Sequence, residues 1–457
     1  MGIGLHGGGI STVRFFAESG AKVIATDLKT EKELAPSIEK MKDLKNVSFI
    51  LGQHRIEDFE NVDMVVKNPA IPWNSKHIQT ALAKKIPVEM DSSLFFRLCK
   101  LPIIGITGTK GKTTTSTLIA EILKTAGKKV FTAGIGQKPV LSLLDEIGET
   151  KKGVVIFELS SWRLSVLGRE NFSPHIAVIT NIFPDHLNYY GKMEKYIADK
   201  KYIFSNQKPE DYVVLNYDNE ISRGLAEEAK SQVIFFSTTE ADCENCVFVK
   251  NGKIIYKSAT EHKEICDLND IKLRGGHNIG NILAAVAATT TYAISADKIC
   301  KAVRNFKGIP HRLELIREIN KVKYYNDTAA TMPDAAIAGI NSFTEPIILI
   351  AGGADKNLDF EAFAKAISEK VKKVILLKGE ATEKIKKELG SLASEKEAKL
   401  PLIDSEFDSM EKAVVRAKNI SGPGDIILLS PGAASFGLFL NEFDRGEKFR
   451  EAVGKLK

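Results

Sequence analysis

The sequence predicts an α/β protein built from parallel sheets in three domains. Short apolar runs alternate with helical patterns along the whole chain, which is the signature of strand–helix–strand units. The chain has 457 residues, and at about 150 residues per domain this length predicts roughly three domains. Apolar residues make up 44% and charged residues 27% of the chain, which excludes disordered, collagen-like and coiled-coil proteins.

Residues 1–92 are expected to form a Rossmann-like domain. Gly7-Gly8-Gly9 opens a predicted helix, and the strand that follows this helix ends at Asp27. An acidic residue at that place commonly binds a ribose in dinucleotide folds. However, His6 stands where the fingerprint G-x-G-x-x-G has its central glycine, and few residues precede Gly4 to form a first strand. A plain glycine turn explains this segment equally well.

The second domain is expected over residues 93–308. A glycine-rich loop, Thr107-Gly-Thr-Lys-Gly-Lys-Thr-Thr114, lies between a predicted strand and a predicted helix. Backbone N–H groups of such a loop bind phosphate oxygens, and the helix N-terminus adds positive potential. The motif predicts bound ATP or GTP with magnesium, with Lys112 at the β- and γ-phosphates and the Thr113 hydroxyl at the metal. The strict motif has glycine where this chain has Ile106, and the alternative is a glycine turn without a ligand.

Polar residues follow the other predicted strands of this domain. Glu158 ends one apolar strand, His186 follows another, and Lys200 lies on the next predicted helix. Ligands bind at the carboxyl ends of parallel strands, and a carboxylate there suits a hard cation. Each residue also has an ordinary structural explanation, as a helix-capping acid, a structural histidine and a solvent-exposed lysine. The predicted strands are residues 102–107, 154–158, 176–180 and 212–215, and the predicted helix after the loop is residues 113–126.

Residues 309–457 are expected to form a second Rossmann-like domain. The net charge of +6 is mild for this length and fits an anionic small molecule, and no dense Lys/Arg tract indicates nucleic acid. The N-terminus lacks the basic and apolar regions of a secretory signal. The longest uncharged stretch, Gly275–Ala296, is too polar to span a membrane and predicts a buried helix. The predicted strands of this domain are residues 347–350, 374–377 and 426–429.

The cysteine pattern indicates a reducing compartment, and we expect a cytoplasmic protein. Five cysteines in a chain of this length do not form a disulfide framework. Cys243 and Cys246 are followed by His262 and Cys266 beyond a predicted Asn-Gly hairpin, an arrangement that could hold zinc tetrahedrally. Because reduced cysteines are ordinary in the cytosol, we expect no structural zinc there.

Ordered segments along essentially the whole chain resemble those of the Mur ligases. The distinctive Glu-Leu-Ser-Ser segment is similar to that of the members that add D-glutamate to UDP-N-acetylmuramoyl-L-alanine. The matching segments are Thr107–Thr114, Glu158–Trp162, Asp185-His186, Gly276–Asn281, Pro310–Glu314, Asn326–Thr331, Gly352–Lys356 and Ser430–Ser435.

The resemblance implies ATP-dependent amide formation through an acyl phosphate. A carboxylate is a poor electrophile until one of its oxygens becomes part of a leaving group. An acyl phosphate hydrolyses in open water, so motifs split among domains allow the site to close around it. Charge builds up on the phosphoryl oxygens, and Lys112 with magnesium would stabilise that charge.

The resemblance also implies two magnesium ions. Thr113 and Glu158 would serve the first ion and His186 the second, bridged by Lys200 carrying a carbamate. A carbamate turns the lysine into an oxygen ligand, which a hard metal prefers. Its formation requires a neutral lysine, although the ordinary pKa is about 10.4. The choice of Lys200 over the adjacent Lys201 depends on helical register.

Further roles follow from the same resemblance. Helix capping is the alternative for Asn278, a surface ion pair for Arg312 and a solvated turn for Lys356. The implied nucleotide-binding residues are Gly108, Thr109, Lys110, Gly111, Lys112, Thr113, Thr114, Asn278, Asn281, Arg312 and Asp327. The implied substrate-binding residues are Gly8, Gly9, Asp27 and Leu28 for the uridine diphosphate, Thr331, Lys356 and Ser435 for the amino acid, and Ser160.

Two positions depart from the family pattern. Ala329 stands where the family usually has lysine, and Gly134 stands where it has an asparagine that contacts the substrate. These departures leave open the same chemistry with another amino acid. The sequence is also compatible with a catalytically silent nucleotide-binding protein, and less readily with a dehydrogenase that uses the first domain. We expect a monomer whose partners are small molecules, namely UDP-N-acetylmuramoyl-L-alanine, D-glutamate and ATP.

Overall fold

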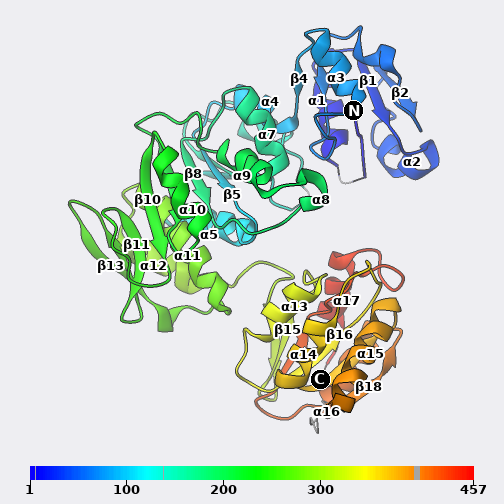
Figure 1. Ribbon diagram of the computed structural model, residues 1–457, viewed down its shortest axis with the longest axis vertical. Helices are drawn as coiled ribbons and strands as arrows, with labels where there is room; N and C mark the ends of the chain where they lie inside the picture. The colour runs from blue at the N-terminus through cyan, green and yellow to red at the C-terminus, as the bar shows by residue number, and fades with distance from the viewer. Residues whose placement is uncertain (6, 137, 396–401, 457) are drawn as a thin grey trace. The chain divides into compact units, whose positions relative to one another are not determined.

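The computed structural model describes residues 1–5, 7–136, 138–395 and 402–456. His6, which interrupts the predicted glycine fingerprint, lies outside the described residues. The chain forms two compact units, residues 1–271 with 280–304, and residues 272–279 with 305–457. Mostly parallel sheets flanked by helices fill both units, which confirms the predicted α/β class (Figure 1). Among the described residues, no helix is long and apolar enough to cross a membrane.

The N-terminal part of the first unit contains two small parallel sheets, β1–β2 and β3–β4. Residues 1–3 lie between them and bond to both through the backbone. Gly2 N donates to Thr26 O at 2.8 Å, and Asn68 N donates to Met1 O at 2.9 Å. These hydrogen bonds connect residues 1 and 2 to both sheets, although residues 1–3 are not part of a strand. The elements are α1 (Gly8–Glu18), β1 (Val23–Asp27), α2 (Glu31–Glu39), β2 (Val47–Leu51), η1 (Ile56–Phe59), β3 (Val65–Val66), α3 (Lys76–Ala83), β4 (Val88–Glu89) and α4 (Asp91–Leu98).

A nine-stranded sheet dominates the rest of the first unit, in the order β13-β12-β11-β10-β9-β8-β5-β7-β6. Strands β5 to β9 are apolar on both faces because helices cover both sides of such a parallel sheet. The strands are β5 (Ile103–Thr107), β6 (Val130–Ala133), β7 (Val154–Glu158), β8 (Ile176–Ile179), β9 (Tyr212–Asn216), β10 (Gln232–Ser237), β11 (Cys246–Lys250), β12 (Lys253–Lys257) and β13 (His262–Asp267). The helices are α5 (Lys112–Thr125), α6 (Leu143–Ile147), α7 (Ser161–Arg169), α8 (Leu187–Tyr190), α9 (Met193–Lys201), α10 (Glu220–Gly224), η2 (Leu225–Glu228), η3 (Leu268–Asp270), α11 (Gly276–Thr290) and α12 (Ala296–Asn305).

The predicted Asn-Gly hairpin is confirmed between β11 and β12. Asn251 and Gly252 have φ angles of 50° and 75°, which a tight hairpin turn of this kind requires. Cys246 pairs with Lys257, which pairs in turn with His262. Cys266 pairs with Ile254 near the other end of the hairpin, so the register separates the groups that a zinc site would have to bring together. The described residues contain no group of three or more His, Cys, Asp or Glu side chains that could hold a metal.

The second unit is a six-stranded sheet in the order β14-β15-β19-β16-β17-β18. Buried aliphatic residues on its two faces form separate cores, one with α13, α14 and α15 and one with α16 and α17. The strands are β14 (Glu314–Ile319), β15 (Val322–Asn326), β16 (Ile347–Ala351), β17 (Val371–Leu377), β18 (Leu402–Phe407) and β19 (Ile426–Leu429). The helices are α13 (Pro333–Ile340), α14 (Glu361–Lys370), α15 (Glu380–Glu395), α16 (Met410–Ile420) and α17 (Glu442–Gly454).

Candidate active site

The glycine-rich loop joins the end of β5 to the start of α5. Gly108 has a φ of 147° and Gly111 a φ of 87°, backbone conformations that residues other than glycine rarely adopt. A Cβ atom at Gly108 would lie 1.9 Å from Thr180 Oγ1, and one at Gly111 would lie 2.1 Å from Asn281 Oδ1. Conformation and space therefore both require glycine at these two positions.

The loop is held against the end of β8. Thr109 N donates to Asn181 O, and Lys110 N donates to Asn181 Oδ1, each at 2.9 Å. The Thr180 hydroxyl donates to Lys110 O at 2.6 Å. Thr180 and Asn181 were not among the predicted site residues. The sequence signal for them is that they directly follow β8, whose carboxyl end adjoins that of β5.

Lys112 begins α5 and folds back over the loop. Its Nζ donates to Gly108 O at 2.9 Å and to Thr109 O at 3.1 Å. The helix N-terminus, the glycine backbone and this ammonium group provide the positive surroundings that a phosphate needs. The loop thus fits the phosphates of a nucleotide, with the Thr113 hydroxyl in the first turn of the same helix.

Glu158 is the last residue of β7 and pairs with Ile106 of β5, the strand that leads into the glycine-rich loop. Its side chain is half-buried. Gly134, with a φ of 71°, lies against this residue. A Cβ atom at Gly134 would lie 2.3 Å from Glu158 O. An asparagine at 134 would therefore force the backbone apart in this chain, which is a physical reason for the departure from the family pattern.

His186 precedes α8 and has a left-handed backbone, with a φ of 54°. Its half-exposed ring packs against Trp162 of α7 at 5.0 Å between ring centroids and against Tyr196 of α9 at 6.2 Å. Asp185 Oδ1 lies 3.9 Å from His186 Nδ1. Two aromatic rings therefore orient an imidazole that remains open to solvent.

Lys200 is buried, with 1% of its surface exposed, and its Nζ lies 3.5 Å from Thr107 Oγ1. Burial and the charge of Lys112 lower the Lys200 pKa to about 7, although Asp185 and Asp199 act in the opposite direction. A large fraction of this amine is therefore neutral near physiological pH. Lys201 is partly exposed and forms an ion pair with Glu228. Of the two adjacent lysines, Lys200 is the one that lies beside the end of β5.

The other residues predicted to bind the nucleotide belong to different units. Asn281, in the first unit, is buried, and its side-chain oxygen lies at Gly111. In the second unit, the Asn278 side chain donates to Arg274 O at 2.6 Å, and Arg312 is exposed. Asp327 accepts a hydrogen bond from Ser430 Oγ at 2.8 Å, and burial raises its pKa to about 7.

The residues predicted to bind the amino-acid substrate lie on loops of the second unit that are hydrogen-bonded to one another. Gly432 N donates to Ala330 O at 2.9 Å, next to Thr331. Ala354 and Ala434 exchange backbone hydrogen bonds of 3.0 and 3.1 Å, close to Lys356 and Ser435. Ser435 is buried, whereas Lys356 is exposed, with its Nζ 5.8 Å from the Phe436 ring centroid.

The predicted uridine diphosphate residues surround the start of α1. A Cβ atom at Gly9 would lie 2.2 Å from Ile3 O, so the helix packs tightly against Ile3. Asp27 is buried and accepts hydrogen bonds of 2.9 Å from Gly4 N and Lys29 N, whereas Leu28 is largely exposed. Gly8 is the first residue of α1. In the central sheet region, Ser160 caps α7 by accepting from Arg163 N at 3.3 Å.

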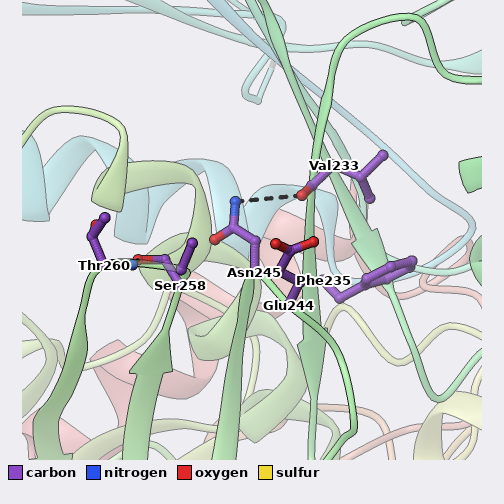
Figure 2. A pocket seen from close by; sticks show the side chains of 7 residues that line it. Val233, Phe235, Glu244, Asn245, Ser258 and Thr260 are labelled. Atoms are coloured by element: carbon purple, nitrogen blue, oxygen red, sulfur yellow. Dashed lines mark hydrogen bonds between the residues drawn. The ribbon is translucent and has the colours of Figure 1, made fainter.

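A separate cavity of about 470 Å³ lies at the start of β10 and β11. Figure 2 shows the Asn245 amide in its wall, donating to Val233 O at 3.4 Å. Strands β5, β8, β9, β10 and β11 are parallel neighbours in the sheet. The starts of β10 and β11 therefore lie at the opposite ends of the strands from the glycine-rich loop, which follows the end of β5. None of the predicted site residues lines this cavity, whose walls are Val233, Phe235, Glu244, Asn245, Ser258, Ala259 and Thr260.

Comparison with known families and proteins covers nearly the whole chain. The Mur ligase MurD-like N-terminal domain matches residues 1–89, the Mur ligase middle domain residues 106–289, and the Mur ligase glutamate ligase domain residues 311–432. The chain is 44% identical to the UDP-N-acetylmuramoylalanine–D-glutamate ligase of Roseiflexus sp. (strain RS-1), over 99% of this chain and 97% of that protein. It is 40% identical to the ligase of the same name from Borreliella afzelii (strain PKo), over 100% of this chain and 97% of that protein.

Solved structures share the fold at lower identity. The UDP-N-acetylmuramate–alanine ligase of Thermotoga maritima matches with a TM-score of 0.60 and 20% identity, over 100% of this chain and 98% of that chain. A MurF ligase from Thermotoga maritima in complex with ADP matches with a TM-score of 0.58 and 16% identity, over 94% and 95% of the two chains.

Proposed function

Because the chain belongs to the Mur ligase family, we propose that it joins D-glutamate to UDP-N-acetylmuramoyl-L-alanine in peptidoglycan precursor synthesis, at the expense of ATP. It is an ATP-dependent acid–amino-acid ligase, and its substrates are small molecules. The single observation that carries this function is the likeness to the D-glutamate-adding ligases along the full chain. The site supports it, because Lys112, Glu158 and Lys200 gather around the ends of β5 and β7.

The proposed reaction has two steps, phosphorylation of the carboxylate and formation of the amide. An oxygen of the substrate carboxylate attacks the γ-phosphorus of ATP, and ADP leaves. The amine of D-glutamate then attacks the acyl carbon, the phosphate leaves, and the ammonium proton is released to solvent. Lys112 and the N-terminus of α5 bind the phosphoryl oxygens and favour the first step as charge moves onto ADP.

Mur ligases use ATP and magnesium, and the donors here suit that metal. We assign Thr113 and Glu158 to one ion and His186 with Lys200 to a second, since hydroxyl and carboxylate oxygens are hard ligands. When bound, magnesium neutralises phosphate charge. Lys200 is proposed to carry a carbamate, and its lowered pKa supports this because only a neutral amine can add carbon dioxide.

The substrate assignments keep the residues expected from the sequence. The nucleotide is assigned to the phosphate loop with Asn278, Asn281, Arg312 and Asp327. The amino acid is assigned to Thr331, Lys356 and Ser435, and the uridine diphosphate to the start of α1 with Asp27 and Leu28. The domain limits 1–92, 93–308 and 309–457, the monomeric state and the cytoplasmic location are parts of the same proposal.

An isotope experiment tests this chemistry directly. The carboxylate of UDP-N-acetylmuramoyl-L-alanine is labelled with ¹⁸O and incubated with protein, ATP, magnesium and D-glutamate. Mass spectrometry is expected to find one ¹⁸O atom in each inorganic phosphate, and an amide product that carries one added glutamyl residue and keeps the other ¹⁸O atom. Unlabelled phosphate formed together with the amide product would contradict the acyl-phosphate route. Absence of product with any amino acid would favour a catalytically silent protein.

A further inference from the structure

Cys243 and Cys246 enclose a two-residue turn at the start of β11, and neither takes part in the proposed ligase reaction. Cys246 Sγ donates to Cys243 O at 3.3 Å, and the two thiols are hydrogen-bonded to each other. Both side chains pack in the same small core, beside Phe235. The turn therefore holds the two sulfur atoms next to each other in the reduced protein.

The neighbouring strands hold this turn in place. Phe235 N donates to Asn245 O at 2.9 Å, and the Asn245 amide donates to Val233 O at 3.4 Å (Figure 2). Cys246 is paired with Phe235 of β10 on one side and with Lys257 of β12 on the other. Two cysteines can be bridged without moving the backbone only where the fold already brings them together. This turn meets that condition.

The surroundings of the pair favour thiol chemistry. Cys243 is partly exposed, whereas Cys246 is completely buried. The hydrogen bond with Cys243 lowers the pKa of Cys246. The positive charge of Lys257 acts in the same direction, although burial and Asp242 oppose it. The thiolate is the reactive form of cysteine, and partly exposed thiols beside a cation are the ones that react. The pair thus combines an accessible sulfur atom with a neighbour that ionises readily.

The other three cysteines lack this combination. Cys266 and Cys300 also contact each other, but both are buried, and burial raises the pKa of Cys266 to about 12. Burial also raises the pKa of Cys99, whose thiol donates to Leu101 O at 3.7 Å. Because a high pKa and burial both suppress thiol reactivity, these residues are controls within the same chain.

We propose that Cys243 and Cys246 form a redox-active dithiol, a modification site that low-molecular-weight disulfides convert reversibly into a disulfide bond. Cys243 Sγ attacks the external disulfide, and a mixed disulfide forms as one thiolate leaves. Cys246 Sγ then attacks Cys243 Sγ, and the second thiolate leaves. The two protein thiols give up two electrons and two protons, and the external disulfide takes up both and becomes two thiols.

The dithiol is separate from the candidate active site. The start of β11 lies at the opposite end of the parallel strands from the phosphate loop. The inference therefore goes beyond the proposed function and does not depend on it. Its test needs no ligase substrate, so its failure and the failure of the proposed function are distinguishable.

Thiol counting under native conditions tests the proposal. Wild-type protein is incubated with oxidised glutathione, quenched with acid, unfolded and alkylated. Mass spectrometry is expected to find a loss of two of the five alkylated cysteines and of two hydrogen atoms from the peptide that carries Cys243 and Cys246. Excess reduced glutathione is expected to restore all five. Formation of a Cys266–Cys300 bond is expected to be at least ~100-fold slower.

Serine variants separate the two steps of the exchange. Cys246→Ser is expected to stop at the mixed disulfide, with one glutathionyl group retained on Cys243. Cys243→Ser removes the accessible sulfur atom and is expected to keep all its remaining thiols reduced. Cys300→Ser is the matched control, because it removes one member of the buried pair, and it is expected to oxidise Cys243 and Cys246 at the wild-type rate.

Three results with wild-type protein would overturn the inference, whether or not the variants fold. The first is retention of all five thiols after prolonged incubation with oxidised glutathione. The second is a bond between Cys266 and Cys300 that forms as fast as the bond at Cys243 and Cys246. The third is loss of thiols only when the circular dichroism spectrum shows that the protein has unfolded.

Discussion

Replacement of Gly108 by alanine tests the phosphate loop most sharply. The φ of 147° belongs to a region that only glycine occupies freely, so a side chain there costs about 1–3 kcal/mol. The added methyl group would lie 1.9 Å from Thr180 Oγ1 and would displace the hydroxyl that holds Lys110 O. Loss of that hydrogen bond costs about another 1 kcal/mol. We therefore expect the first unit to lose about 2–4 kcal/mol of stability.

The assay compares melting temperature and the KM for ATP. Gly108→Ala is expected to lower the melting temperature of the first unit by roughly 5–10 °C and to raise the KM for ATP at least tenfold. Gly224→Ala is the matched control, because a Cβ atom there meets nothing within 4 Å and its φ is −62°. The control is expected to be neutral or slightly stabilising. If Gly108→Ala behaves like the control, the loop does not have the constrained geometry from which nucleotide binding is argued.

Three further predictions concern other parts of the chain. Lys112→Met is expected to lower the rate of phosphate release by about 100-fold or more, with an unchanged circular dichroism spectrum, because it removes the ammonium group from the phosphate loop; retained activity would contradict its assignment. Burial raises the pKa of Asp327 to about 7 in the folded protein, so wild-type stability is expected to fall as pH rises from about 4 to 7. Relative to wild type, Asp327→Asn is therefore expected to be increasingly stable over this range and to keep a constant advantage above it. Melting temperature measured against pH checks this, and the two profiles should otherwise run parallel. Ser165→Ala is expected to cost about 1–2 kcal/mol in denaturant unfolding, because it removes the 2.8 Å hydrogen bond from Trp73 Nε1. Thr80→Ala is the control, because it removes an exposed hydroxyl hydrogen bond to Lys76 O within α3.

Much of the fold could be predicted from the sequence because its central strands are buried on both faces. β7 and β19 have the bounds that their continuous apolar runs predict, and β5 and β8 differ by one residue. β14, in contrast, lies at a sheet edge and alternates half-buried with exposed residues, so no apolar run marks it. The hairpin between β11 and β12 was predictable because an Asn-Gly turn acts locally.

The candidate site divides in the same way. The phosphate loop and the strand-end positions of Glu158 and His186 follow from local sequence patterns. The contacts of Thr180 and Asn181 with the loop depend on the pairing of β5 with β8, which no spacing in the sequence specifies. Burial of Lys200 rather than Lys201 depends on which face of α9 packs inward, and this depends on the tertiary fold.

The most direct test of the proposed function is phosphate release by purified protein with ATP, magnesium and UDP-N-acetylmuramoyl-L-alanine. D-glutamate would be compared with L-glutamate and with a panel of other amino acids. The account predicts release that depends on D-glutamate, which would also show that Ala329 is compatible with this specificity. Release with a different amino acid would keep the ligase chemistry and contradict the proposed substrate. No release with any amino acid would contradict the central claim that this chain is an active ligase of its family.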